Sequence, residues 1–178
     1  MTHRLRWAYT VVLALLISLV AEKGMSQTDH VSVLIGKWEV TGVRLDETLM
    51  RRPNYNYDDP ELVGRWMLFS RKSILTNTPE DTSCQHPLVR SEVETIEGLV
   101  GRTMAKAKYS GGETNKFALP VDTMKNVEVL WVTCKKGHIG PDTPFGPENF
   151  NWIARLSDNE LAMRWYDNTI LLLKRQPK

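Results

Sequence analysis

The sequence lacks the short motifs that mark the commonest catalytic sites. It contains no glycine-rich phosphate loop, no Gly-x-Ser-x-Gly nucleophile motif, no His-Glu-x-x-His helix and no acidic calcium-binding loop. Neighbouring acids such as Asp58 and Asp59 lie in a stretch of loop composition, whereas acid–base catalysis needs a carboxyl group whose pKa is shifted by a cleft. We therefore expect that the protein is not an enzyme.

Histidine and cysteine are too scarce for a typical metal centre. Beyond residue 26 the histidines are His30, His86 and His138. Structural zinc normally takes four protein ligands. The nearness of Cys84 to His86 would suit a catalytic cysteine only if the thiol stayed reduced. We expect no metal and no cofactor.

No apolar run in the chain reaches the length of a membrane-spanning helix. The longest, Ala8 to Ala21, has about fourteen residues, whereas a spanning helix needs roughly twenty. Basic residues precede this run, and small residues follow it at the positions that a signal peptidase inspects for a cut before Gln27. We predict a signal peptide at residues 1–26, with an uncleaved single-pass anchor as the alternative.

The predicted mature chain has no excess of charge. Residues 1–26 hold three of the 23 basic residues and one of the 21 acidic ones, so residues 27–178 contain equal numbers of each. Nucleic-acid binding needs a basic footprint, which a neutral chain does not supply. We predict one domain over 27–178, with no nucleic-acid partner and no stable membrane anchor after cleavage.

The two cysteines, Cys84 and Cys134, suit an oxidising compartment. In an exported protein a disulfide between them is the default expectation. The chain has no Asn-x-Ser/Thr glycosylation site, which favours a bacterial envelope over a eukaryotic secretory route. We therefore predict a periplasmic or secreted bacterial protein.

Most of the predicted mature chain has the residue pattern of β-strands. β-Branched, aromatic and alternating residues predict strands at 33–44, 62–69, 73–78, 117–121, 127–134, 152–156, 160–166 and 169–175. Asp and Asn residues between the last three predict hairpin turns. Because Ser157 and Glu160 also fit a capping box, a helix is the alternative there.

The middle of the chain has a different periodicity. Two prolines predict a loop over 78–87, and Asp59 before Pro60 predicts a short helical turn. Ser91 and Glu94 fit a capping box followed by apolar residues at helical spacing, which predicts a helix over about 91–107. The predicted fold is mainly β: an antiparallel meander closed or nearly closed into a barrel, with one central α-helix.

Gly36-Lys37-Trp38, on the first predicted strand, is similar to the Gly-x-Trp signature of lipocalin-like (calycin-type) β-barrel proteins. The resemblance implies that Trp38 closes one end of the barrel and that a basic residue, Arg175 or Arg164, packs across it. It also implies a small apolar ligand. The chain departs from this family by its predicted central helix and by the lack of a Thr-Asp-Tyr motif.

Aromatic residues supply the candidate binding sites. Three tryptophans on predicted strands suit an apolar pocket, with core packing as the other interpretation: Trp38, Trp66 and Trp131. The long loop over 46–59 contains the residue types that anchor protein interfaces: Arg51, Arg52, Tyr55 and Tyr57.

These features suggest two functions. The first is an exported, non-enzymatic, lipocalin-like protein that binds a small hydrophobic ligand. The alternative is a periplasmic inhibitor or immunity protein, for example of a cell-wall hydrolase, which would contact its partner through the loop over 46–59.

Overall fold

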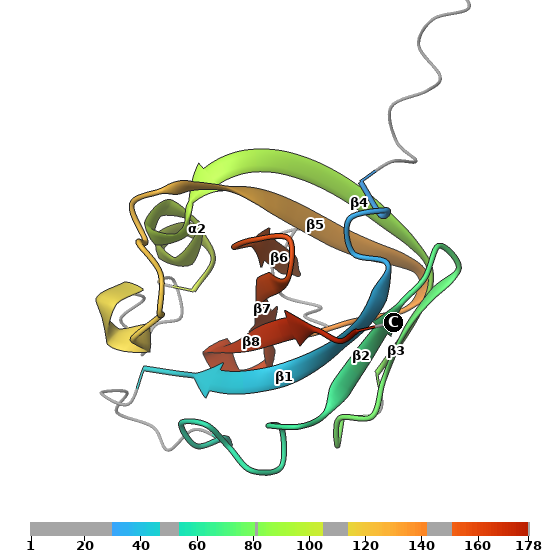
Figure 1. Cartoon of the computed structure of the whole chain (residues 1–178), viewed down its shortest axis with the longest axis horizontal. Helices are drawn as coiled ribbons and strands as arrows, with labels where there is room; N and C mark the ends of the chain where they lie inside the picture. The colour runs from blue at the N-terminus through green and yellow to red at the C-terminus, as the bar shows by residue number, and fades with distance from the viewer. Residues whose placement is uncertain (1–29, 47–53, 81, 105–113, 142–150, 178) are drawn as a thin grey trace, which may run out of the picture.

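Eight antiparallel strands form a closed barrel in which each strand pairs with the next along the chain and β8 pairs with β1 (Figure 1). The computed structural model describes residues 30–46, 54–80, 82–104, 114–141 and 151–177. The strands are β1 (Gly36–Arg44), β2 (Trp66–Phe69), β3 (Ser73–Thr76), β4 (Ser83–Thr95), β5 (Asn126–Gly137), β6 (Trp152–Arg155), β7 (Glu160–Trp165) and β8 (Thr169–Arg175). The predicted fold class, a mainly β meander closed into a barrel, is confirmed.

The last three strands lie where the sequence predicts them, and the segment after Ser157 is a strand rather than the alternative helix. The connection between β7 and β8 is the short 3-10 turn η2 (Tyr166–Asn168), in which Asp167 and Asn168 have positive φ. Asp and Asn tolerate this left-handed conformation better than most residues do. The residue composition of this turn therefore favours the hairpin that the sequence predicts.

The predicted helix over 91–107 is wrong in its first part. β4 continues to Thr95 and pairs with β5 along its length, and helix α2 (Ile96–Thr103) begins only afterwards. Thr95, not Ser91, is the N-cap, since its side chain accepts a hydrogen bond from the backbone N–H of Gly98. Pairing with a long neighbouring strand overrode the local helical spacing. Residues 105–107 lie outside the described residues.

The loop predicted over 78–87 is also wrong in its second half, because β4 begins at Ser83. Pro87 lies within this strand, opposite Cys134 on β5. On its other side β3 pairs only with residues 83–85, so no ladder bond on that side needs the N–H that proline lacks. A proline that normally signals a loop is therefore tolerated.

Several other assignments also differ from the prediction. The strand predicted over 117–121 is absent: the 3-10 helix η1 (Thr114–Phe117) is followed by Ala118, whose φ is positive. β1 begins at Gly36 and β2 at Trp66, because turns occupy the residues before them.

The helical turn predicted at Asp59 forms, and the carboxylate of Asp59 accepts a hydrogen bond from the N–H of Glu61.

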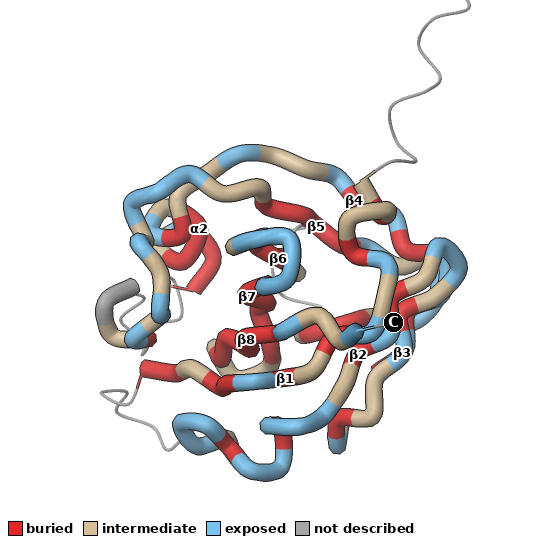
Figure 2. The backbone as a smooth tube through the Cα atoms, in the orientation of Figure 1, coloured by how far each residue is buried: buried red, intermediate tan, exposed pale blue. Residues whose placement is uncertain are grey.

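Buried side chains form two clusters, one on each face of the sheet. The first fills the barrel and includes Trp38, Met67, Leu130 and Trp165. The second lies on the outer face of β5 to β8, where α2 and η1 cover the strands (Figure 1). With both faces covered, β7 and β8 are buried over most of their length (Figure 2).

Cys84 and Cys134 form the predicted disulfide between β4 and β5, with a Cα–Cα distance of 5.3 Å. Nearby, Gly137 has φ +75, and a Cβ there would lie 2.0 Å from the carbonyl oxygen of Ser83, so this position requires glycine. The disulfide is typical of a protein outside the cytoplasm. Within the described part of the chain, the helices are too short or too polar to span a membrane.

Candidate functional site

Trp38 and Arg175 close one end of the barrel. The indole of Trp38 is fully buried, and its N–H donates to the carbonyl of Leu34 at 2.7 Å. The Arg175 guanidinium lies 4.1 Å above the ring and donates to the carbonyls of Val33, Ile35 and Asp158. Of the two predicted partners, Arg175 packs across Trp38, whereas Arg164 lies buried on β7. This end is a packed plug rather than an entrance.

At the other end, the connection between β1 and β2 brings Tyr55 against the interior cluster. Its hydroxyl donates to the carboxylate of Glu80. Partial burial and this hydrogen bond raise the pKa of the Tyr55 phenol well above its usual range. Tyr166 lies close by, with its ring in edge-on contact with Trp165. Aromatic side chains thus pack this end as well.

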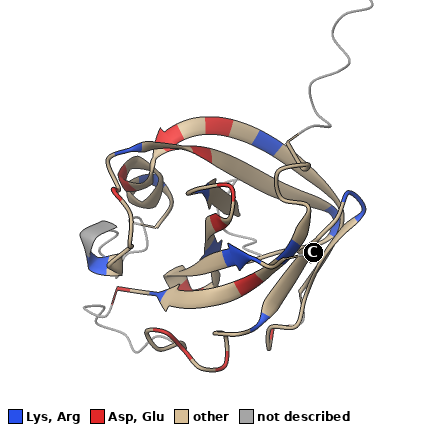
Figure 3. Cartoon of the chain, viewed as in Figure 1, with Lys and Arg blue, Asp and Glu red and all other residues tan. Residues whose placement is uncertain are grey.

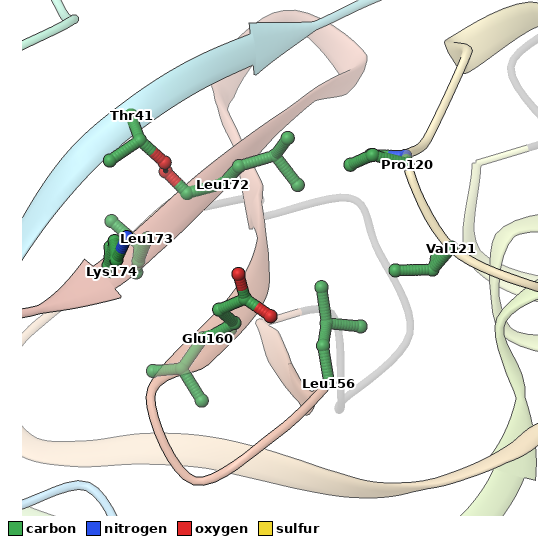
Figure 4. A pocket seen from close by; sticks show the side chains of 9 residues that line it. Thr41, Pro120, Val121, Leu156, Glu160, Leu172, Leu173 and Lys174 are labelled. Atoms are coloured by element: carbon green, nitrogen blue, oxygen red, sulfur yellow. Dashed lines mark hydrogen bonds between the residues drawn. The ribbon is translucent and has the colours of Figure 1, made fainter.

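A pocket of about 330 Å³ lies on the outer face of the barrel, between β7, β8 and the chain that precedes β5. Its volume is within the range of small-molecule sites. Most of its lining is apolar and comes from Pro120, Val121, Leu156, Leu161, Leu172 and Leu173. Leu161 and Leu173 also belong to the interior cluster, whereas Leu172 belongs to the outer one. Figure 4 shows Pro120, Val121, Leu156 and Leu172 around the pocket. The polar lining consists of Thr41, Glu160 and Lys174. This composition, an apolar body with a few polar groups, is that of a site for a small apolar molecule.

A bulge in β1 forms one side of the pocket. Val40 pairs with Leu173 and Gly42 with Leu172, which leaves Thr41 as an extra residue without a partner in the ladder. A bulge bends its strand and redirects a side chain. The Thr41 hydroxyl donates to the carbonyl of Leu172 at 3.3 Å, so it is held at the pocket wall.

The opposite side of the pocket is irregular chain, anchored at both ends. Phe117 is buried in the outer cluster, and residues 118–123 follow it. The carbonyl of Thr123 accepts a hydrogen bond from the N–H of Glu97, in the first turn of α2. Pro120 and Val121 are thereby held opposite β8, and the strands cannot close the gap because this segment does not pair with them.

Charges of both signs lie at the mouth of the pocket. Glu160 and Lys174 are opposite each other on β7 and β8, and Lys174 is also opposite Glu39 on β1. Both Glu160 and Lys174 are exposed. The mouth can therefore accept hydrogen bonds as well as donate them to the polar end of a ligand.

The three tryptophans predicted to bind ligand lie in three separate places. Trp38 is inside the barrel, and Trp66 is on the outer face of β2, where the ammonium group of Lys37 lies 5.4 Å from its ring. Trp131 is under α2, where Arg102 contacts its ring. The structure does not bring them together, and none of them lines the pocket.

The structure describes two of the four predicted partner-binding residues, Tyr55 and Tyr57. Arg51 and Arg52 lie outside the described residues. Tyr55 is turned inward toward Glu80, whereas Tyr57 is exposed and stacks under the guanidinium of Arg44 at 4.4 Å.

His30 is half-buried against the barrel. Its ring nitrogens are 3.4 Å from the Ser91 hydroxyl and 4.0 Å from the Glu128 carboxylate, which also pairs with Arg155. These contacts attach the start of the described chain to β4 and β5. No group of three or more potential metal ligands occurs among the described residues.

The chain was compared with protein-family models, curated proteins and solved structures, and none matches it. The evidence that this pocket is a binding site is therefore its volume and its lining. Sequence reasoning missed it because its walls combine an unpaired bulge residue with irregular chain. The one available signal was Pro120, which interrupts the strand predicted over 117–121.

Proposed function

We propose that this protein is an exported, lipocalin-like, non-enzymatic binding protein for a small hydrophobic molecule. The observation that carries the proposal is the pocket of about 330 Å³ beside β8, with its mainly apolar lining. The resemblance around Trp38 implies a small apolar ligand, and the three tryptophans predicted to bind it, Trp38, Trp66 and Trp131, do not line this pocket. We place the ligand on the flank instead, because large side chains fill the interior cluster.

The polar groups at the mouth define the kind of ligand. An apolar body would contact Leu156 and Leu172 and leave water, which supplies most of the binding free energy. A hydroxyl, amide or amine at one end would then reach Glu160 or Lys174. A purely anionic head is less suitable, because Glu39 and Glu160 flank the single ammonium group of Lys174.

A neutral apolar fluorophore tests the site. N-phenylnaphthylamine should bind the chain from Gln27 onward, which contains every described residue, with increased fluorescence and saturation at one equivalent. Thr41→Trp should abolish this binding, because an indole at this exposed bulge position would occupy the pocket.

Thr133→Trp is the matched control, since Thr133 is also an exposed strand residue but does not line the pocket. It should bind the fluorophore as the unmodified chain does. Equal binding by all three proteins would rule out the pocket as the site.

The inhibitor hypothesis remains a second proposal, supported by the exposed ring of Tyr57. Tyr55 fits it poorly, because its hydroxyl is bound to Glu80.

Periplasmic or secreted localisation after cleavage near Ser26 is part of both proposals, and the disulfide between Cys84 and Cys134 supports it. Recovery of the chain from the envelope fraction with Gln27 as its first residue would test it.

A further inference from the structure

One wall of the barrel contains basic residues but no acidic ones. The sequence has no Asp or Glu over 62–79, 82–91 and 129–141, although residues 27–178 as a whole are neutral. These ranges contain β2, β3, the first part of β4 and the second part of β5, which are consecutive in the sheet. Figure 3 shows blue bands on this side of the ribbon, and the nearest red segments lie on the second part of β4 and in the connection after β3. We call this side the acid-free wall.

Basic side chains gather on the acid-free wall near the turn between β2 and β3. The carbonyl of Lys72, in this turn, accepts a hydrogen bond from the N–H of His86 on β4. Lys136 is on β5, one strand further, so its backbone is roughly 10 Å from that of Lys72. Lys72, Lys135 and Lys136 are exposed, and none of the three forms an ion pair with a described residue. Among the described residues, therefore, no ion pair compensates these charges.

Exposed leucines accompany these lysines on the outer face. Leu68 and Leu75 are direct cross-strand partners and are 40% and 43% exposed. They face outward, because their neighbours Met67 and Ile74 are buried in the barrel. Leu88, 47% exposed, lies two residues beyond His86 on β4. Leucines thus lie on both sides of Lys72 along the wall.

We propose that the acid-free wall docks on a membrane surface that contains anionic lipids. Lys72, Lys135 and Lys136 would contact the lipid phosphates, while the leucines enter the boundary between headgroups and acyl chains. An acidic macromolecule would also attract the lysines. It would gain little from single leucines dispersed among them, whereas a membrane interface accommodates both kinds of side chain. This docking does not depend on the pocket beside β8.

Vesicle co-sedimentation tests the proposal with the chain from Gln27 onward, which excludes the apolar run of the leader. Vesicles of equal parts phosphatidylcholine and phosphatidylglycerol should bind the protein at low salt, and vesicles of phosphatidylcholine alone should not. Lys72→Gln with Lys136→Gln should weaken binding roughly twenty-five-fold, because each cation near an anionic surface contributes about fivefold. Added salt should weaken it further.

Two more variants separate the possible partners. Lys125→Gln, an exposed lysine outside the acid-free wall, should bind vesicles as the unmodified chain does. Leu75→Ser should reduce vesicle binding several-fold and leave the melting temperature unchanged. If Leu75→Ser has no effect while the protein binds heparin as tightly as vesicles, the partner is an acidic macromolecule and the proposal is wrong. Equal binding to both kinds of vesicle would also overturn it.

Discussion

The guanidinium of Arg175, on the last strand, lies 4.1 Å above the indole ring of Trp38, on the first. The two residues are also direct partners in the ladder that closes the barrel. Hydrogen bonds to carbonyls join Arg175 to the turn over 30–35 and to the connection after β6, and stacking joins it to the Trp38 ring. One side chain therefore holds the two ends of the described chain together.

Arg175→Lys should lower the free energy of unfolding by about 2 kcal/mol. Lysine keeps the charge but not the planar group that stacks on Trp38 and reaches several carbonyls at once. Urea denaturation measures the change. Arg65→Lys is the control, because Arg65 is exposed and donates to one carbonyl, that of Glu61. A loss equally large in the control would show that the contact with Trp38 has no special weight.

Tyr55→Phe should lower stability by about 1 kcal/mol at neutral pH, since it removes the hydrogen bond to Glu80. It should also change the response to alkali. The folded chain holds the Tyr55 proton to higher pH than the unfolded chain, whose tyrosines titrate near pH 10. The contribution of this group to stability is therefore complete below about pH 10 and is lost as the pH rises above it.

Urea denaturation at a series of alkaline pH values tests this sign. The difference in stability between the unmodified chain and Tyr55→Phe should shrink above about pH 10. Tyr57→Phe, which changes an exposed tyrosine of the same connection, should show no such difference. A difference that stays constant with pH would contradict the bond to Glu80.

Removing the disulfide by Cys84→Ser with Cys134→Ser should lower stability by about 2–4 kcal/mol. The bridge closes a loop with a sequence separation of 50, and this constraint on the unfolded chain is lost. Chemical denaturation of the double variant gives the magnitude. Thiol labelling of the unmodified chain under denaturing, non-reducing conditions should find no free thiol, and two reactive thiols would contradict the bridge.

The sequence predicted best where local residues alone decide the structure. β7 and β8 were placed well because Asp167 and Asn168 both favour a left-handed turn. The stretch from Ser91 to Thr95 was misassigned, because its strand state depends on pairing with distant β5. Pro87 misled for a similar reason, since its tolerance depends on where β3 stops pairing.

Candidate sites were harder to predict than strands. Cys84 and Cys134 followed from chemistry, because only one pairing was possible. The sequence could not show that Trp66 and Trp131 lie outside the barrel, since it does not reveal which face of a curved sheet meets a covering helix. The role of Thr41 depends on a one-residue bulge, which becomes visible only in the register of β1 against β8.

Amide NMR spectra recorded during titration with N-phenylnaphthylamine test the central claim, a ligand pocket on the flank of the barrel, most directly. Saturating shifts should appear for Thr41, Val121 and Glu160, which line the pocket. The amide signals of interior residues such as Met67 should not shift. Shifts confined to residues that face the barrel interior, or no saturable shifts at all, would contradict the claim.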